Sequence, residues 1–137
     1  MIPLDEALSR ILADVNAQTA EENVPLSQAL DRVLASDVHS GIDVPPWDNS
    51  AMDGFAVRSA DTRQAGASLS VVQRIVAGSG GEALAGGSAA RIFTGAPLPP
   101  GADAVLMQEE ARPQGDKVVC TRSIAAGENI RPRAQDI

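Results

Sequence analysis

The sequence predicts an α+β fold, in which two N-terminal helices precede a mainly β domain of barrel- or sandwich-like form. Two observations carry this prediction. Apolar residues recur with helical spacing over the first part of the chain, and beyond it glycine and proline separate short runs of strand-forming residues. We therefore assign residues 1–45 to a helical and linker segment and residues 46–137 to the β domain.

The two helices are predicted from apolar spacing and from residues that favour helix starts. Apolar residues three and four positions apart run from Leu4 to Val15, and Asp5 and Glu6 suit the positive end of a first turn. The second helix is predicted over residues 27–35, where a serine can cap the start and apolar side chains mark one face.

The β domain is predicted from short segments at fairly regular spacing, as in compact barrels and sandwiches. The predicted strands are residues 54–58, 69–76, 90–93, 104–107, 117–121 and 129–131. Aromatic residues make up only 2% of the chain, so the core must consist mainly of valine, leucine, isoleucine and alanine. No helical pattern follows the glycine-rich residues 78–81, which predict a turn and not a phosphate loop.

Composition excludes several classes of function. The formal net charge of −7 disfavours binding to nucleic acid or to an anionic membrane surface. The single cysteine, Cys120, excludes an intrachain disulfide and lies in a predicted strand, where we expect an inert packing residue. The first residues lack the basic and apolar regions of a signal peptide, and no apolar run approaches membrane-spanning length, so we expect a cytoplasmic protein.

The first candidate functional segment covers residues 43–57 and contains three carboxylates, two prolines and a closing glycine. Asp48, Asn49 and Ser50 are residue types that hydrogen-bond to nearby backbone, and this structural role is the favoured alternative to a ligand contact for them. Asp53 differs because it immediately precedes Gly54 and a predicted buried strand. A carboxylate at such a strand entrance could face a cleft and hold a divalent cation or orient a water molecule.

The second candidate segment covers residues 91–105, where a predicted strand leads into Thr94, Gly95 and a proline-rich loop. A hydroxyl and an unhindered backbone N–H at a strand end can both contact an oxyanion. The alternative is an ordinary Gly-Pro connection between two strands.

The third candidate segment covers residues 127–137, in which Arg131 and Arg133 flank Pro132 in an otherwise acidic chain. Guanidinium groups bind phosphate and similar oxyanions through paired hydrogen bonds. The alternative is a solvated, charged segment without a ligand.

Together, the three segments resemble one family, in order and at fitting spacing. They read Asp-Asn-Ser-Ala-Met-Asp-Gly-Phe-Ala-Val at 48–57, Thr-Gly-Ala-Pro-Leu-Pro-Pro-Gly-Ala-Asp-Ala-Val at 94–105 and Gly-Glu-Asn-Ile-Arg-Pro-Arg-Ala-Gln-Asp-Ile at 127–137. They are similar to the N-terminal region of the MoeA/gephyrin E-domain family of molybdopterin molybdenumtransferases, as are residues 26–38. Trp47 stands where that family often has phenylalanine. Family members continue beyond this region through a molybdopterin-binding domain and a C-terminal β domain.

The resemblance implies a reaction and its requirements. The family inserts molybdenum from molybdate into adenylylated molybdopterin, releases AMP, and is assisted by Mg²⁺. The site in the family lies at a homodimer interface, between this region of one subunit and the molybdopterin-binding domain of the other. Because that domain is missing here, we expect the chain to be inactive alone. The alternative function is a non-catalytic dimerisation or scaffold module.

The resemblance also implies site residues. It assigns catalytic roles to Asp53 and Asp136, which are also the expected ligands of Mg²⁺. Contacts with the substrate are expected from four further residues: Ser50, Thr94, Gly95 and Arg131.

Overall fold

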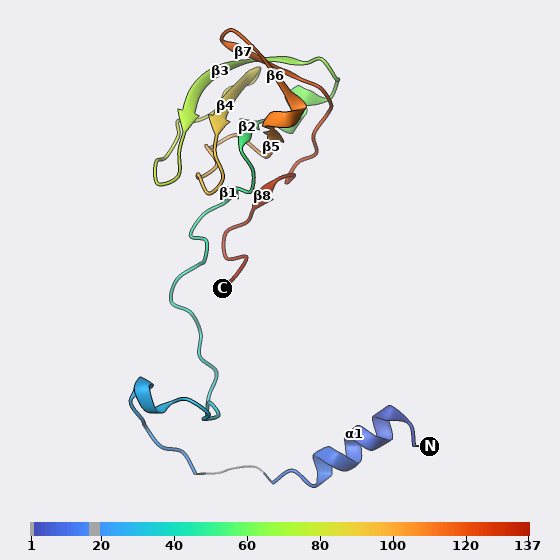
Figure 1. The fold of residues 1–137 in the computed structure, drawn as a ribbon, viewed down its shortest axis with the longest axis vertical. Helices are drawn as coiled ribbons and strands as arrows, with labels where there is room; N and C mark the ends of the chain where they lie inside the picture. Colours follow the sequence, from blue (N-terminus) through green and yellow to red (C-terminus); the bar gives the residue numbers. More distant parts are fainter. Residues whose placement is uncertain (1, 17–19) are drawn as a thin grey trace. The chain divides into compact units, whose positions relative to one another are not determined.

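The computed structural model describes residues 2–16 and 20–137, and the chain divides into two units, Met1–His39 and Ser40–Ile137 (Figure 1). The first unit contains the predicted first helix, α1 (Leu4–Ala13), with Asp5 and Glu6 in its first turn. Arg10 forms an ion pair with Glu6 one turn earlier, at 2.6 Å. Within the described ranges, no helix has the length and apolar character needed to cross a membrane.

The predicted second helix is wrong. A single 3-10 turn, η1 (Leu26–Gln28), is the only helical element in this stretch of the described chain. Asp31 has a φ of 63°, in the left-handed region, which no α-helix continues through. Leu30 and Val33 are 84% and 95% exposed. A short helix depends on packing of its apolar face, and these side chains are not buried.

The second unit is built from eight strands. They are β1 (Asn49–Ser50), β2 (Gly54–Val57), β3 (Ser68–Ile75), β4 (Ser88–Ile92), β5 (Ala104–Met107), β6 (Ala111–Gln114), β7 (Lys117–Cys120) and β8 (Ile130–Arg131). Two 3-10 turns, η2 (Ser59–Thr62) and η3 (Gln108–Glu110), follow β2 and β5.

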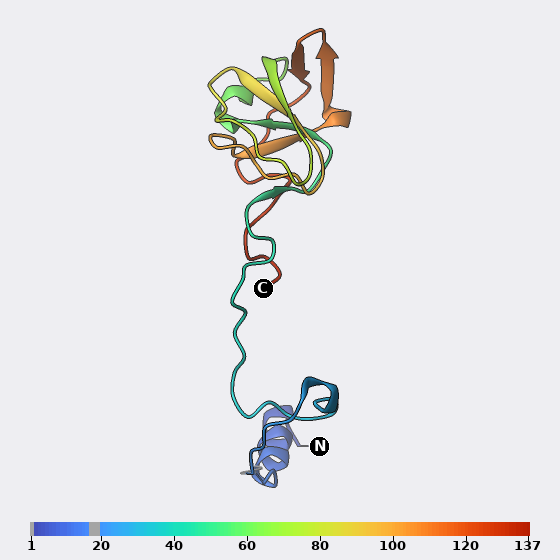
Figure 2. The same ribbon diagram turned by 90° about the vertical axis from the view of Figure 1, so that its left-hand side faces the viewer.

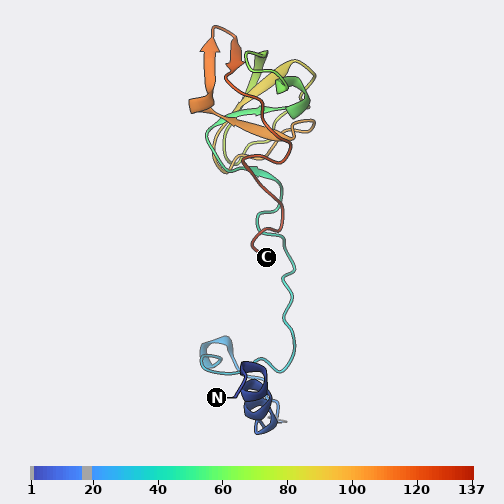
Figure 3. The same ribbon diagram turned by 90° about the vertical axis from the view of Figure 1, so that its right-hand side faces the viewer.

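Six of these strands form one sheet in the order β5-β2-β4-β3-β7-β6, and β1 pairs with β8. All pairs are antiparallel except β3 with β4. The sheet curls into a half-barrel, and the β6–β7 hairpin projects from it (Figures 2 and 3). The mainly β prediction is thus confirmed for this unit.

Each of the six predicted strands overlaps a strand of the structure, but two strands were missed. β1 is only two residues long, too short for a periodic pattern. β6 contains Pro113, which has no backbone N–H and argues against a strand when only the sequence is considered. The pairing of β6 with β7 places this proline at the edge of the sheet, where its lack of a donor is tolerated.

The core forms two layers, one on each face of the central strands. Phe55 and Val57 of β2 and Leu106 of β5 belong to one layer. Ala56 and Val105, at the alternate positions, belong to the other. This alternation follows from the two-residue repeat of a strand. As expected from the composition, aliphatic side chains make up nearly all of both layers.

Cys120 packs in the first of these layers, where it is fully buried. Burial raises the pKa of its thiol, so the side chain stays protonated and unreactive at neutral pH.

Residues before β1 belong to the β unit because they pair with the end of the chain. The Asp136 N–H donates to the Val44 carbonyl at 2.9 Å, and the Ala134 N–H donates to the Pro45 carbonyl at 3.0 Å. The Val44–Pro45 peptide bond is cis. The second unit, Ser40–Ile137, accordingly includes these residues.

Removing buried volume from the core should destabilise the β unit. Leu106 is fully buried, so Leu106→Ala should lower the free energy of unfolding by about 3 kcal/mol through lost burial and a new cavity. The measurement is equilibrium urea denaturation. Val72→Ala is the control: Val72 is 59% exposed on β3, and the change should stay within about 0.5 kcal/mol. Equal effects of the two substitutions would contradict the core assignment.

Candidate functional site

Asp53 and Thr94, from the first and second candidate segments, meet directly in the structure. Asp53 lies just before β2, and Thr94 lies just after β4, its antiparallel neighbour. The backbone N–H and the hydroxyl of Thr94 both donate to Oδ1 of Asp53, each at 2.9 Å. The backbone carbonyl of Asp53 accepts a hydrogen bond from the Gln108 N–H at 3.0 Å. Side chain and backbone of Asp53 are thus both held.

These contacts favour the ionised form of Asp53. The hydrogen bond from the Thr94 backbone N–H, followed by that from its hydroxyl, holds the pKa of Asp53 below its usual value. The nearby positive charge of Arg91 lowers the pKa further. Asp53 is therefore a carboxylate at neutral pH, available as a ligand for a cation or as an acceptor for a water molecule.

The close approach of β2 and β5 explains why the residue after Asp53 is a glycine. A Cβ atom on Gly54 would lie 2.0 Å from the carbonyl oxygen of Leu106 on β5. That distance is far below any van der Waals contact, so only glycine allows β2 and β5 to pair here. The pairing of these two strands fixes the position of Asp53 along the sheet edge.

The groups predicted to contact an oxyanion have protein partners in this structure. Both donors of Thr94 are directed to Asp53. The Gly95 N–H donates to the carbonyl of Ser50 at 2.9 Å, and Gly95 has a φ of 80°, which favours glycine. Ser50 is buried, and its hydroxyl donates to the Met52 carbonyl at 2.5 Å. Ser50 and Gly95 therefore shape the loops that carry Asp53 and Thr94.

Arg131 and Asp136, from the third candidate segment, form an ion pair with each other. Arg131 lies in β8 opposite Asn49 of β1, and the N–H of Ser50 on β1 donates to the Ala96 carbonyl at 2.9 Å. Strand β1 is therefore flanked by the second segment on one side and the third on the other. The three segments meet around β1 and the start of β2.

Two residues that were not predicted as site residues belong to this region. Arg91 of β4 donates to the Gly54 carbonyl at 2.8 Å, and an arginine inside an otherwise apolar strand was the available signal. Asn49 has a buried side-chain oxygen with no hydrogen-bond partner in the described part of the protein. No pattern in the sequence marks that atom.

The expected magnesium ligands, Asp53 and Asp136, belong to no larger cluster of metal-binding side chains among the described residues. In the part of the chain that the structure describes, no group of three or more His, Cys, Asp or Glu side chains could hold a metal ion. Mg²⁺ in phosphate-handling sites is commonly bound by only one or two carboxylates, with water and substrate phosphate as the other ligands. Asp53 fits that requirement as one ligand, whereas Asp136 already neutralises Arg131.

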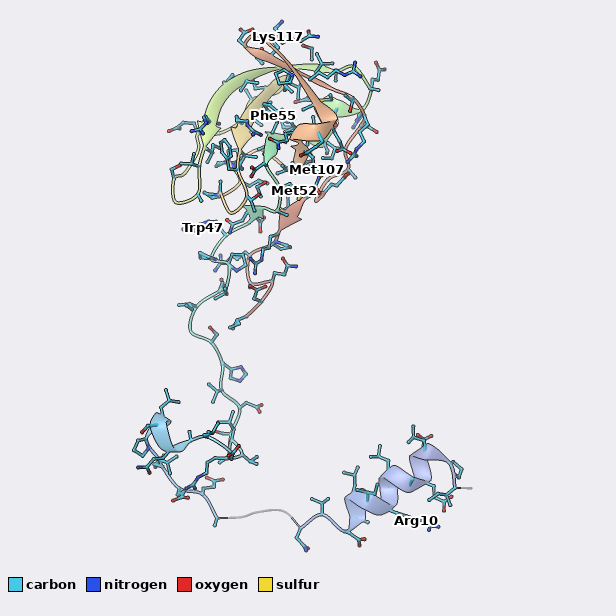
Figure 4. The ribbon with its side chains drawn as sticks, viewed as in Figure 1. Arg10, Trp47, Met52, Phe55, Met107 and Lys117 are labelled. Atoms are coloured by element: carbon cyan, nitrogen blue, oxygen red, sulfur yellow. The ribbon has the colours of Figure 1, made fainter. Side chains whose placement is uncertain are left out.

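The hollows on the β unit lie at a different place. Two surface pockets, of about 360 and 400 Å³, both border Trp47, which is half exposed. Figure 4 shows Trp47 at the end of this unit opposite to Lys117. Neither pocket is lined by Asp53 or Thr94. Thr94 is exposed and Asp53 is partly buried, so the pair lies at the surface of the β unit.

The chain is similar to known proteins over its whole length. Residues 2–137 match the family described as the MoeA N-terminal region (domain I and II). A molybdopterin molybdenumtransferase from Nostoc sp. is 43% identical over 129 residues, which is 90% of this chain and 30% of the relative. Another from Haemophilus influenzae is 40% identical over 139 residues, covering 100% of this chain and 34% of the relative.

A solved structure agrees with these sequence matches. The crystal structure of the molybdopterin biosynthesis MoeA protein from Pyrococcus horikoshii OT3 matches with a TM-score of 0.76 and 39% identity. The match covers 100% of this chain and 38% of that one. The chain spans about a third of the length of the curated relatives described above. The three motifs lie together in the structure, and the sequence and structure matches agree with each other. The chain therefore belongs to the MoeA N-terminal region family.

Proposed function

We propose that this chain supplies one wall of the active site of a molybdopterin molybdenumtransferase. The reaction would insert molybdenum from molybdate into adenylylated molybdopterin and release AMP, within the cytoplasmic pathway of molybdenum cofactor biosynthesis. The observation that carries the proposal is the double hydrogen bond from Thr94 to Asp53, which brings the first two motifs together. The names of the relatives in the same family support the choice of substrate.

In this proposal, Asp53 is the catalytic carboxylate. Thr94 holds Oδ1, and Oδ2 has no hydrogen-bond partner within residues 2–16 and 20–137. Oδ2 would therefore face the ligand, where it could bind Mg²⁺ or orient a water molecule towards the phosphoanhydride. When bound there, Mg²⁺ would offset the repulsion between the carboxylate and the phosphates. The role of Thr94 is to favour the ionised form of Asp53 and to fix the orientation of its carboxylate.

Arg131 would neutralise a phosphate or molybdate oxyanion in the same site. Its Nη2 is held by Asp136, which orients the planar guanidinium and leaves its other N–H groups for a ligand. Asp136 would then act through Arg131, or as a second carboxylate near the metal. Ser50 and Gly95 would set the loop shapes through their hydrogen bonds to Met52 and to each other.

The complete site would require a second subunit. This chain offers one or two carboxylates at its surface, so the remaining ligands and the walls that exclude water must come from elsewhere. We propose that they come from the molybdopterin-binding domain of the other subunit of a homodimer. On this proposal, the chain alone binds parts of the substrate weakly and does not turn it over.

Removing the charge of Asp53 should abolish most of the activity of the full-length protein that contains this chain. Asp53→Asn keeps the size of the side chain and an oxygen acceptor for Thr94, but it removes the negative charge. Loss of a catalytic acid–base or metal-binding group should lower kcat/KM by about 100-fold or more. The measurement is AMP release from adenylylated molybdopterin in the presence of molybdate and Mg²⁺.

Asp116→Asn provides the matched control, because Asp116 is an exposed aspartate in the β6–β7 turn. Its activity should equal that of the wild type. Near-normal turnover of Asp53→Asn would remove Asp53 from the mechanism.

Asp53 should titrate below its usual pKa, and this shift should depend on the Thr94 hydroxyl. Thr94→Val removes the second of the two hydrogen bonds, so the pKa of Asp53 should rise towards its usual value. Because the folded-state pKa is lowered, the stability gained from ionised Asp53 is present above the unfolded-state pKa and is lost as the pH falls through the folded-state pKa. The measurement is a ¹³C carboxyl NMR titration.

Thr121→Val is the control for this titration, because the Thr121 hydroxyl donates to the Glu110 carbonyl and not to Asp53. Its Asp53 titration should coincide with that of the wild type. A normal pKa for Asp53 in the wild type would contradict the Thr94 contacts.

A second candidate function is dimerisation without catalysis, and the first unit provides the observation that favours it. None of the residues of α1 is buried, and the apolar side chains along one face, including Leu8 and Leu12, are half or more exposed. An amphipathic helix with an uncovered apolar face is typical of a protein–protein contact.

Self-association through α1 should be sensitive to a charge on its apolar face. Leu8→Glu places a carboxylate in that face, which costs free energy when the face is covered. The monomer fraction in sedimentation velocity should therefore increase. Ala13→Glu adds the same charge on the opposite side of the helix and should leave the association unchanged. A wild-type chain that is monomeric at every concentration would exclude α1 as the dimer contact.

A further inference from the structure

Arg91 occupies an unusual place for an arginine. It lies in β4 between Ala90 and Ile92, both of which are fully buried. Arg91 itself is partly buried, and a guanidinium in such a place is favoured when its donors are satisfied. Nη1 donates to the Gly54 carbonyl at 2.8 Å, and Nη2 donates to Oε1 of Gln108 at 2.9 Å. Both acceptors are uncharged, so the contact is not an ordinary ion pair.

Two aromatic rings fix the plane of this guanidinium. Its central carbon lies 4.6 Å from the centroid of Phe93 and 5.2 Å from the centroid of Phe55. A guanidinium over an aromatic face is held by both charge and stacking. Arg74 of the neighbouring β3 also lies over the Phe93 ring, at 4.5 Å. Phe93 immediately precedes Thr94, so these contacts reach the partner of Asp53.

The hydrogen bonds of Arg91 and Gln108 form one closed network around the backbone of Asp53 and Gly54. Nη1 holds the Gly54 carbonyl, and Nη2 holds the side chain of Gln108. The backbone N–H of the same Gln108 holds the Asp53 carbonyl at 3.0 Å. The carbonyl groups of Asp53 and of Gly54 are therefore both restrained by this one network. The planar guanidinium presents its donors in fixed directions, whereas a lysine ammonium carries its three donors on a flexible stem and holds the same two acceptors in no fixed geometry.

We propose that Arg91 is a positioning residue, whose fork fixes the Asp53–Gly54 backbone so that the Asp53 carboxylate stays turned towards the substrate. The structural part of this proposal stands on the contacts above. Its consequence for catalysis rests on the proposed function. Arg91 acts through Asp53 and is not itself required to touch the substrate.

The test compares Arg91→Lys with Arg74→Lys in the full-length protein that contains this chain. Both substitutions keep a positive charge near the Phe93 ring, but only the first loses the fork that holds Gly54 and Gln108. For Arg91→Lys, kcat should fall by about tenfold or more because small misplacements of a catalytic group are costly, while KM changes little. Arg74→Lys should retain the wild-type kcat.

A second measurement does not depend on activity. Hydrogen exchange of the Gln108 amide, which donates to Asp53, should accelerate by about tenfold or more in Arg91→Lys, as expected for a weakened local network. The amide of Val118 in β7 should exchange as in the wild type. Gln108→Ala removes one part of this network without touching the arginine and should lower kcat in the same direction. This variant keeps the test available if Arg91→Lys does not fold.

Several outcomes would overturn the proposal. Wild-type kcat together with unchanged Gln108 exchange in Arg91→Lys would show that the fork does not position Asp53. A raised KM with unchanged kcat would make Arg91 a direct substrate contact instead, and an equal loss in Arg74→Lys would reduce its role to charge. If the wild-type protein has no molybdenumtransferase activity, the proposed function fails, but Gln108 exchange still decides whether Arg91 holds the Asp53–Gly54 backbone.

Discussion

The close approach of β2 and β5 at Gly54 is the constraint on which the rest of the β unit depends. β2 lies between β4 and β5, and its alternate residues enter both core layers. A side chain at Gly54 would collide with the β5 backbone and push the two strands apart. That shift would loosen both layers at once. It would also move the Asp53 carbonyl away from Gln108, so the packing of the core and the geometry of the site share one cause.

The strands were largely predictable from the sequence, because short runs of strand-forming residues separated by glycine or proline are local signals. Residues 27–35 misled prediction for the same reason. Their helical period is real, but a helix there needs a surface to cover its apolar face, and the period carries no information about that surface. β6 was missed because Pro113 is a local argument against a strand, and only the pairing with β7 shows that it lies at an edge.

The site was predictable as a set of motifs but not as an arrangement. Asp53 and Thr94 are separated by 41 positions, and their contact depends on the antiparallel pairing of β2 with β4. No local pattern contains that information. Arg91 was missed because an arginine in a short strand reads equally well as an outward-facing residue. Its role depends on acceptors that lie on two other segments, because its guanidinium donates to the Gly54 carbonyl and to the side-chain oxygen of Gln108.

The pairing of residues 44–45 with residues 134–136 has a consequence for how this unit can be used. Residues 44–45 and residues 134–136, close to the two ends of the β unit, lie side by side and are joined by backbone hydrogen bonds (Figure 1). A domain whose two ends are neighbours can be inserted into a loop of another protein with little distortion of the host. The half-barrel is therefore suited to transfer between polypeptides, by recombination or by design, with the contact between Asp53 and Thr94 preserved.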